Sequence, residues 1–146
     1  MSKQELDNNI LPTDTQPTSK TNGKRNKNAG NGFERECVIK LRPIFPNIST
    51  SRYNSRHRDN TKVDLMNIDE SKHGRLPYNF QCKTLAKHAD YCKLLAEMPK
   101  DAEINVVIHR KTKKSEAGRF IKQGTYAIMN VDDFYDMIAE LEMRKL

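Results

Sequence analysis

The stretch Asn79-Phe80-Gln81-Cys82-Lys83 largely determines how this chain is expected to fold. Apolar and polar side chains alternate along it, and a period of two is typical of a β-strand with one buried face. We therefore expect Phe80 and Cys82 to point into a core. Gln81 and Lys83 then lie next to each other on the opposite face of the sheet.

A second stretch, Lys62-Val63-Asp64-Leu65, shows the same alternation, which places Asp64 on the side away from its two apolar neighbours. Between the two stretches the polar segment 69–74 is suited to a turn, so we expect the strands to pair as an antiparallel hairpin. Asp64 then comes within side-chain reach of Gln81 and Lys83.

Periodicity predicts an α/β fold around this hairpin. Apolar residues recur at helical spacing from Gly32 and predict a helix of about three turns, which Pro43 and Pro46 end. The last predicted helix carries an apolar stripe that we expect to face the core: Val131, Phe134, Tyr135, Ile138 and Leu141. The order is α-β-β-β-α-β-β-α, with strands near 49–53, 62–68 and 77–83, a helix at 85–98, strands at 104–108 and 126–129, and a helix at 131–145.

Glu34 stands out in the first helix because its carboxylate falls on the apolar face. It lies three, four and seven residues ahead of the side chains of that face, Cys37, Val38 and Leu41. A carboxylate there needs a partner. Glu36 lies four residues before Lys40 on another face, where an exposed ion pair explains it. We therefore assign chemistry to Glu34 and none to Glu36.

Glu34, Asp64 and Gln81 together offer carboxylate and amide oxygens, which are the ligands that a hard divalent cation prefers. Lys83 adds an ammonium group beside them. These groups suit phosphodiester hydrolysis, in which a cation polarises the phosphate and a lysine orients the water or stabilises the developing charge. Considered singly, each residue is better explained as a solvated side chain. Only their joint placement points to chemistry.

Four motifs also occur in the order seen in archaeal-type Holliday junction resolvases, which belong to the PD-(D/E)xK nuclease superfamily. They are Gly32-Phe33-Glu34-Arg35-Glu36, Ser55-Arg56, Lys62-Val63-Asp64-Leu65 and Gln81-Cys82-Lys83. The resemblance covers roughly residues 30–110. It implies a restriction-endonuclease-like core, in which a mixed sheet of about five strands is flanked by helices. It also implies a homodimeric enzyme that cuts four-way DNA junctions.

The resemblance assigns roles to individual residues. Glu34 and Asp64 would bind Mg2+, with Mn2+ as a substitute, and Lys83 would be the catalytic lysine. Gln81 stands where the family has an acidic residue, and the backbone carbonyl of Cys82 would also reach the metal. The lost negative charge at Gln81 leaves two outcomes open, weaker metal binding or a relative that no longer cuts, although related nucleases tolerate Gln there. The segment between Asp64 and Gln81 is longer than in the archaeal proteins, so the substrate could differ too.

The net charge of +7 and the pI of about 9.4 favour polyanions as partners, although basic proteins also bind acidic proteins or membranes. Ordinary surface charge explains Lys113 and Lys114 equally well. The residues that we expect to contact DNA are Arg35, Arg52, Arg56, Arg58, Lys62, Lys87, Lys113 and Lys114.

Residues 1–31 are polar and nearly lack aliphatic side chains after Leu11, which predicts a disordered arm ahead of a nuclease domain at 32–146. The arm could tether DNA or have no role. No run approaches the ~20 apolar residues of a membrane span, and no secretory signal is visible, so we expect a cytoplasmic protein without a membrane partner, in the host cytoplasm if a phage encodes it. The three cysteines show no CxxC spacing, which argues against a disulfide framework and a zinc site.

Three functions are compatible with these patterns. The first is a homodimeric nuclease that cuts DNA junctions. The second is a related nuclease that cuts duplex DNA or forks. The third is a DNA-binding protein that keeps the fold but does not cut. The motifs do not separate the first two, because DNA shape is recognised by surfaces that the sequence does not place.

Overall fold

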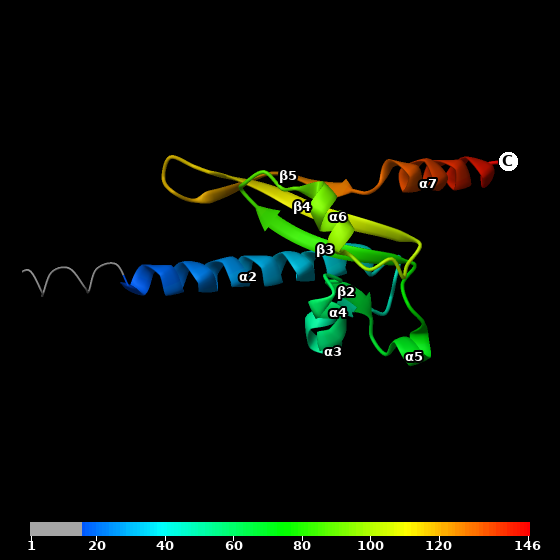
Figure 1. Cartoon of the computed structure of the whole chain (residues 1–146), viewed down its shortest axis with the longest axis horizontal. Coiled ribbons are helices and arrows are strands. Elements are labelled where there is room, and N and C mark those ends of the chain that lie inside the picture. Colours follow the sequence, from blue (N-terminus) through cyan, green and yellow to red (C-terminus); the bar gives the residue numbers. More distant parts are fainter. Residues whose placement is uncertain (1–15) are drawn as a thin grey trace, which may run out of the picture. The chain divides into compact units, whose positions relative to one another are not determined.

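The computed structural model describes residues 16–146, and residues 1–15 of the predicted arm lie outside the described residues (Figure 1). The chain divides into two units, Met1–Gly32 and Phe33–Leu146, and the second contains the whole sheet. Helix α2 (Gln16–Leu41) begins earlier than the helix expected near Gly32, so the described part of the predicted arm is helical.

The unit Phe33–Leu146 is an α/β fold built on one five-stranded sheet, with strand order β1-β2-β3-β4-β5. The strands β3 and β4 pair in parallel and the other neighbours pair antiparallel, so the sheet is mixed, as predicted. After α2 the elements are β1 (Ile48–Thr50), α3 (Ser51–Asn54), α4 (Arg56–Asn60), β2 (Leu65–Asn67), α5 (Glu70–His73), β3 (Tyr78–Leu85), α6 (Tyr91–Glu97), β4 (Ile104–Lys114), β5 (Phe120–Ile128) and α7 (Val131–Met143).

The sequence did not predict the three short helices α3, α4 and α5. Helix α3 replaces most of the strand predicted near residues 49–53. Local hydrogen bonds explain the difference. The Asn54 side chain donates to the carbonyl of Thr50 at 2.7 Å, and the Ser55 side chain accepts from the backbone N–H of Arg58 and caps α4. Such side-chain bonds favour turns and helix starts over a strand ladder.

The strands β2 and β3 form the predicted antiparallel pair, with Leu65 opposite Phe80. Their connection is longer than a simple turn, because it contains α5. Asp69 before this helix and Gly74 after it have φ values of 49° and 78°. Glycine adopts such a positive φ without strain, so Gly74 suits the point where the chain leaves the helix.

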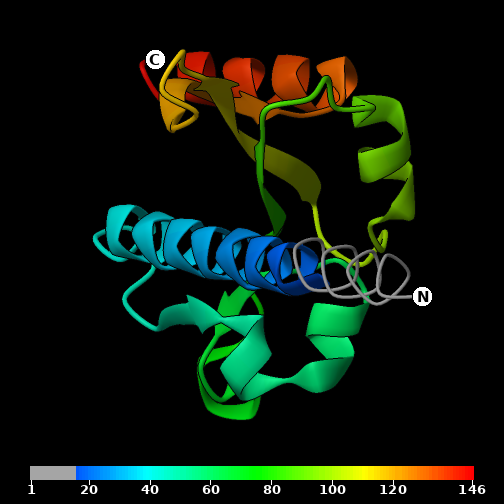
Figure 2. The ribbon, with the colours of Figure 1, turned by 90° about the vertical axis from the view of Figure 1, so that its left-hand side faces the viewer.

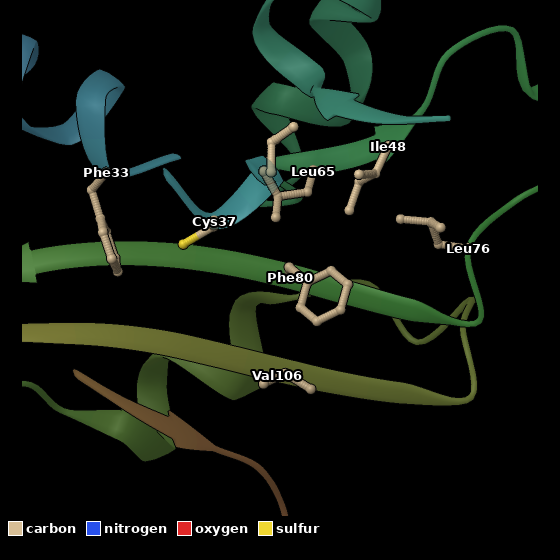
Figure 3. Packing of buried hydrophobic residues seen from close by; sticks show 8 residues of the cluster. Phe33, Cys37, Ile48, Leu65, Leu76, Phe80 and Val106 are labelled. Carbon is tan, nitrogen blue, oxygen red and sulfur yellow. The ribbon is translucent and has the colours of Figure 1, made fainter. Parts of the chain in front are cut away.

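The core of this unit lies between the C-terminal part of α2 and one face of the sheet. Phe33 and Cys37 of α2 pack with Leu65, Phe80 and Val106, which come from β2, β3 and β4 (Figure 3). Leu65 and Phe80 are therefore core residues, as the alternation predicted. Since successive strand residues point to opposite faces, Gln81 and Lys83 lie on the other face of β3.

Helix α7 does not bury its apolar stripe, and here the expectation from the sequence was wrong. The five stripe residues are between 40% and 62% exposed: Val131, Phe134, Tyr135, Ile138 and Leu141. In Figure 2, α7 lies at one end of the sheet, and α3 and α4 lie at the other. An amphipathic pattern predicts that a helix has a packing surface, but it does not say that the partner is part of the same chain.

No helix within residues 16–146 is long and apolar enough to cross a membrane.

Candidate functional site

Asp64 lies directly before β2 and is fixed by three hydrogen bonds. Its backbone N–H donates to the carbonyl of Phe80 at 2.8 Å, and its own carbonyl accepts from the N–H of Ser51 at 2.8 Å. Its carboxylate accepts from the backbone N–H of Cys82 at 2.7 Å. The antiparallel pair thus holds this carboxylate against the middle residue of Gln81-Cys82-Lys83, which brings together the two stretches that the alternation predicted to meet.

Glu34 comes to the same place from α2. Its half-buried carboxylate forms an ion pair with Arg52 of α3. Burial, and then the negative charge of Asp64, raise the pKa of Glu34 from 4.5 to about 7. Burial also raises the pKa of Asp64, although its bond to Cys82 and the charge of Lys83 oppose the rise. Two partly desolvated carboxylates, one of which raises the proton affinity of the other, suit a cation.

Gln81 is the most enclosed of the candidate ligands. Its side chain is only 2% exposed, and its amide oxygen has no hydrogen-bond partner among the described residues. A buried amide oxygen without a partner is costly, so its position favours a ligand that is not part of the chain. A divalent cation that prefers oxygen ligands fits this donor set of Glu34, Asp64 and Gln81.

Within residues 16–146 no group of three or more His, Cys, Asp or Glu side chains is arranged to hold a metal ion. The candidate set has only two carboxylates, because an amide stands in the third position. The site would thus rely on neutral oxygens, and a cation bound there would be less fully neutralised than in a site with three carboxylates.

Lys83 and Cys82 complete the motif from opposite faces of β3. Lys83 is half-buried, and its positive charge lowers the pKa of Asp64, so the ammonium group acts on that carboxylate. The Cys82 thiol shares a hydrogen bond with Cys37 of α2, which raises the pKa of Cys82. Asp64 thus holds the backbone N–H of Cys82, and Cys37 holds its thiol. Metal binding by the carbonyl of Cys82 stays a prediction.

The cations expected to contact DNA fall into two groups. Arg52 is engaged with Glu34, and Arg58 is buried, so neither is a free surface charge. The exposed members are Arg35, Arg56, Lys62, Lys87, Lys113 and Lys114. Of these, Lys113 and Lys114 lie at the end of β4, where the β4–β5 hairpin turns.

Arg58 takes part in a structural network, which counts against the predicted DNA contact. Its guanidinium group pairs with Asp101 at 3.1 Å and donates to Asn79 at 3.4 Å. Asn79 is fully buried and also donates to Asp101. These contacts tie α4 to the start of β3 and to the segment before β4. Sequence spacing did not predict these contacts, because Arg58, Asn79 and Asp101 are far apart along the chain.

Two further residues near the site escaped the sequence analysis or were assigned differently. Asp59 of α4 contributes negative charge that raises the pKa of both Glu34 and Asp64. It lay in a segment where no helix was expected. Glu36 pairs with Arg110 of β4 and not with Lys40, because the folded sheet brings a stronger partner to it than the helix does.

Comparisons with protein-family models, with curated proteins and with solved structures found no match to this chain.

Proposed function

We propose that this chain is a metal-dependent endodeoxyribonuclease that cuts branched DNA. The observation that carries the proposal is that the carboxylate of Asp64 is held by the backbone of Cys82 and raises the pKa of Glu34, while the adjoining Gln81 is buried with an amide oxygen that has no partner among the described residues. Lys83 supplies the nearby positive charge. These residues resemble the motifs of PD-(D/E)xK nucleases, and a mixed five-stranded sheet flanked by helices is what that resemblance implied.

Glu34, Asp64 and Gln81 would hold Mg2+, which supplies Lewis-acid polarisation of the phosphate and a more acidic water when it is bound. Three residues of the chain have separate parts in this. Glu34 has to lose its proton and its contact with Arg52 to become a ligand. Asp64 is kept in place by the backbone of Cys82. Lys83, whose charge acts on Asp64, would orient the attacking water or stabilise the charge on the phosphate.

Exposed cations supply the attraction to DNA. Arg56 begins α4 and Lys62 follows it, and Lys113 and Lys114 lie on the β4–β5 hairpin. Each can contact a backbone phosphate, which gives affinity without reading bases. No recognition-helix motif for the major groove is apparent in the sequence, so DNA shape is the better source of selectivity.

The test is cleavage of labelled four-way junction, fork and linear duplex, each with Mg2+, Mn2+ or EDTA. We expect metal-dependent cuts in the junction. Lys83→Ala should abolish cleavage and leave junction binding within a few-fold, and Asp64→Asn should abolish cleavage and weaken Mn2+ binding in a calorimetric titration. Lys100→Ala, which removes an exposed lysine outside the site, is the control. Wild-type turnover by Lys83→Ala would reject the site.

Gln81 supports a second candidate, a DNA-binding protein that no longer cuts. The amide removes one negative charge from the site, and a cation would bind less tightly there. Tight junction binding without cleavage under either metal would favour this candidate over the nuclease.

A further inference from the structure

The hairpin of β4 and β5 extends past the other strands of the sheet. Strand β3 ends at Leu85, which pairs with Lys111, whereas β4 continues to Lys114. Within the described chain, residues 112–114 therefore pair with β5 alone, at residues 120–122. Figure 1 shows the two strands reaching beyond the end of β3. Residues 112–122, the hairpin tip, form a two-stranded ribbon, and none of them belongs to the hydrophobic core or packs against it.

Phe120 lies on this hairpin tip with its side chain in solvent. It is 64% exposed. Its neighbours follow from the strand register. Lys114 lies directly opposite Phe120 on β4, and Lys122 lies two residues further along β5, so both share its face of the ribbon. Ile121 and its partner Lys113 lie on the other face. The Phe120 ring is thus an exposed apolar surface with a lysine on two of its sides.

The hairpin tip is strongly basic. It contains one carboxylate and four cations, and the ion pairs of the described residues involve none of the four: Lys113, Lys114, Arg119 and Lys122. Unpaired cations in this number attract a polyanion. A second copy of the tip is a poor cover, because pairing would bring like charges together. A membrane surface fits less well, since the two large apolar side chains of the tip, Phe120 and Ile121, are on opposite faces.

An aromatic ring between cations suits a nucleobase that is flanked by phosphates. Every base has a flat apolar face, and stacking on an aromatic side chain buries this face whatever the sequence. In linear duplex the faces are covered by the neighbouring base pairs. A branch interrupts the stack and leaves a base face open, so the ring gains a contact at a branch that duplex does not offer.

We propose that Phe120 stacks on a base that the branch of a DNA substrate leaves uncovered, while Lys114 and Lys122 contact the adjoining phosphates. Phe120 is then the residue that distinguishes branched from linear DNA, whereas the cations of the hairpin tip attract both. The inference rests on the proposed function for its DNA substrate, and it requires neither a bound metal nor cleavage. It also accounts for an aromatic side chain that the fold itself leaves exposed.

The first experiment measures binding of the full chain in EDTA, by fluorescence anisotropy, to a fork with unpaired arms and to a linear duplex of the same sequence. The wild type should prefer the fork. Phe120→Ala should weaken fork binding by about 5- to 100-fold, which is the loss expected for one stacked base, and should leave the slope of log K against log salt unaltered. Phe120→Tyr keeps the ring and should bind the fork as the wild type does. Ile121→Ala, the matched control on the other face, should keep the preference.

Undiminished fork binding by Phe120→Ala, or an equal loss in Ile121→Ala, would overturn the proposal. So would a Phe120→Ala variant that binds the fork normally but loses binding to vesicles of phosphatidylcholine and phosphatidylserine, because the ring would then belong to a lipid contact. Since EDTA removes any metal-dependent cleavage, the result is separate from the nuclease. A chain that binds the fork through Phe120 and never cuts when metal is added would reject the proposed nuclease and support this inference.

The second experiment uses the fact that the chain contains no tryptophan. Phe120→Trp places a single indole at the stacking position, and Ile121→Trp places one on the other face of the ribbon. Stacking on a base quenches indole fluorescence. The fork should therefore quench Phe120→Trp more than the duplex does, and it should leave Ile121→Trp nearly unquenched. Quenching of Ile121→Trp alone, or equal quenching of Phe120→Trp by fork and duplex, would exclude stacking of residue 120 at the branch.

Discussion

Gln81 illustrates what a single residue reveals only after folding. The alternation along 79–83 predicted its face correctly, and the motif predicted its neighbours. Nothing in the local pattern predicted that the side chain would be almost completely buried with an unpartnered amide oxygen. Burial depends on β4, which is remote in sequence and pairs with β3 in parallel. The strand pattern around a residue determines which face of the sheet its side chain occupies. How far that side chain is removed from water depends on segments that are remote in sequence.

Gln81→Glu provides a test of the cation site that does not depend on activity. Without metal, the variant should unfold at a lower temperature than the wild type, because a carboxylate then takes the buried place of the amide. With Mg2+ or Mn2+, its melting temperature should rise by more than that of the wild type, and cleavage should be kept or increased. Thermal melting with EDTA and with each metal measures both. Equal metal shifts in the two proteins would contradict a ligand role for residue 81.

The pKa of Glu34 predicts how stability depends on pH when no metal is present. Its folded-state value of about 7 lies above the ordinary 4.5, so the folded protein binds the proton more tightly than the unfolded chain. The stabilisation from this group is therefore complete below about pH 4.5 and is lost as the pH rises through 7. Melting in EDTA between pH 5 and pH 8 should show a decline that Glu34→Gln reduces.

Metal should reverse this trend, because only the ionised carboxylate is a good ligand. The rise in melting temperature caused by Mg2+ should therefore be larger at pH 8 than at pH 6. A metal-induced rise that is the same at both pH values would show that Glu34 does not bind the ion.

At the scale of elements, the sequence predicted the types of the long segments better than their partners. The strands β2 and β3 paired as expected because a one-residue shift would expose their apolar face. Helix α7 formed as expected, but its apolar stripe stays largely exposed. The short helices α3 and α4 depend on single hydrogen bonds from Asn54 and Ser55, which periodicity does not register. A helix or strand is therefore predictable where many residues share one periodic pattern, and not where a single side-chain hydrogen bond decides.

Arg58 also acts between elements, because it connects α4 with β3 and with the segment before β4. Arg58→Ala should lower the free energy of unfolding by about 1–3 kcal/mol, since it leaves the buried Oδ1 of Asn79 without its donor and removes one of the two arginine partners of Asp101. Arg56→Ala, two residues away on the exposed side of α4, should lower junction affinity and leave stability within about 0.5 kcal/mol. Urea unfolding and fluorescence anisotropy separate the two effects. If Arg58→Ala were as stable as the wild type but bound DNA poorly, the result would instead support the phosphate contact that the sequence predicted for Arg58.

At the scale of the whole molecule, charge is divided between regions. The β4–β5 hairpin carries cations, whereas α7 carries carboxylates. The net charge of +7 therefore understates how strongly one part of the surface attracts a polyanion. Composition predicted the sign of this attraction. It did not predict the division, because that depends on which segments the fold leaves exposed.

Salt dependence tests the contribution of the hairpin. Junction binding should fall steeply with salt, and the Lys113→Gln, Lys114→Gln double variant should flatten the slope of log K against log salt by about 0.9 for each phosphate that is no longer neutralised. Lys100→Gln should not change the slope. An unaltered slope in the double variant would mean that these two lysines are ordinary surface charge, the alternative that the sequence left open.

The parallel pairing of β3 with β4 also bears on how the chain folds. The hairpin of β4 and β5 joins residues that are close along the chain, so its loop closure is cheap and we expect it to form early. Glu34, Asp64 and Gln81 come together only when distant segments and the crossover through α6 have assembled. The amide of Cys82, which bonds to Asp64, should then exchange its hydrogen faster than the amides that pair β4 with β5. A chain that opens even partially would lose this site while the hairpin persists.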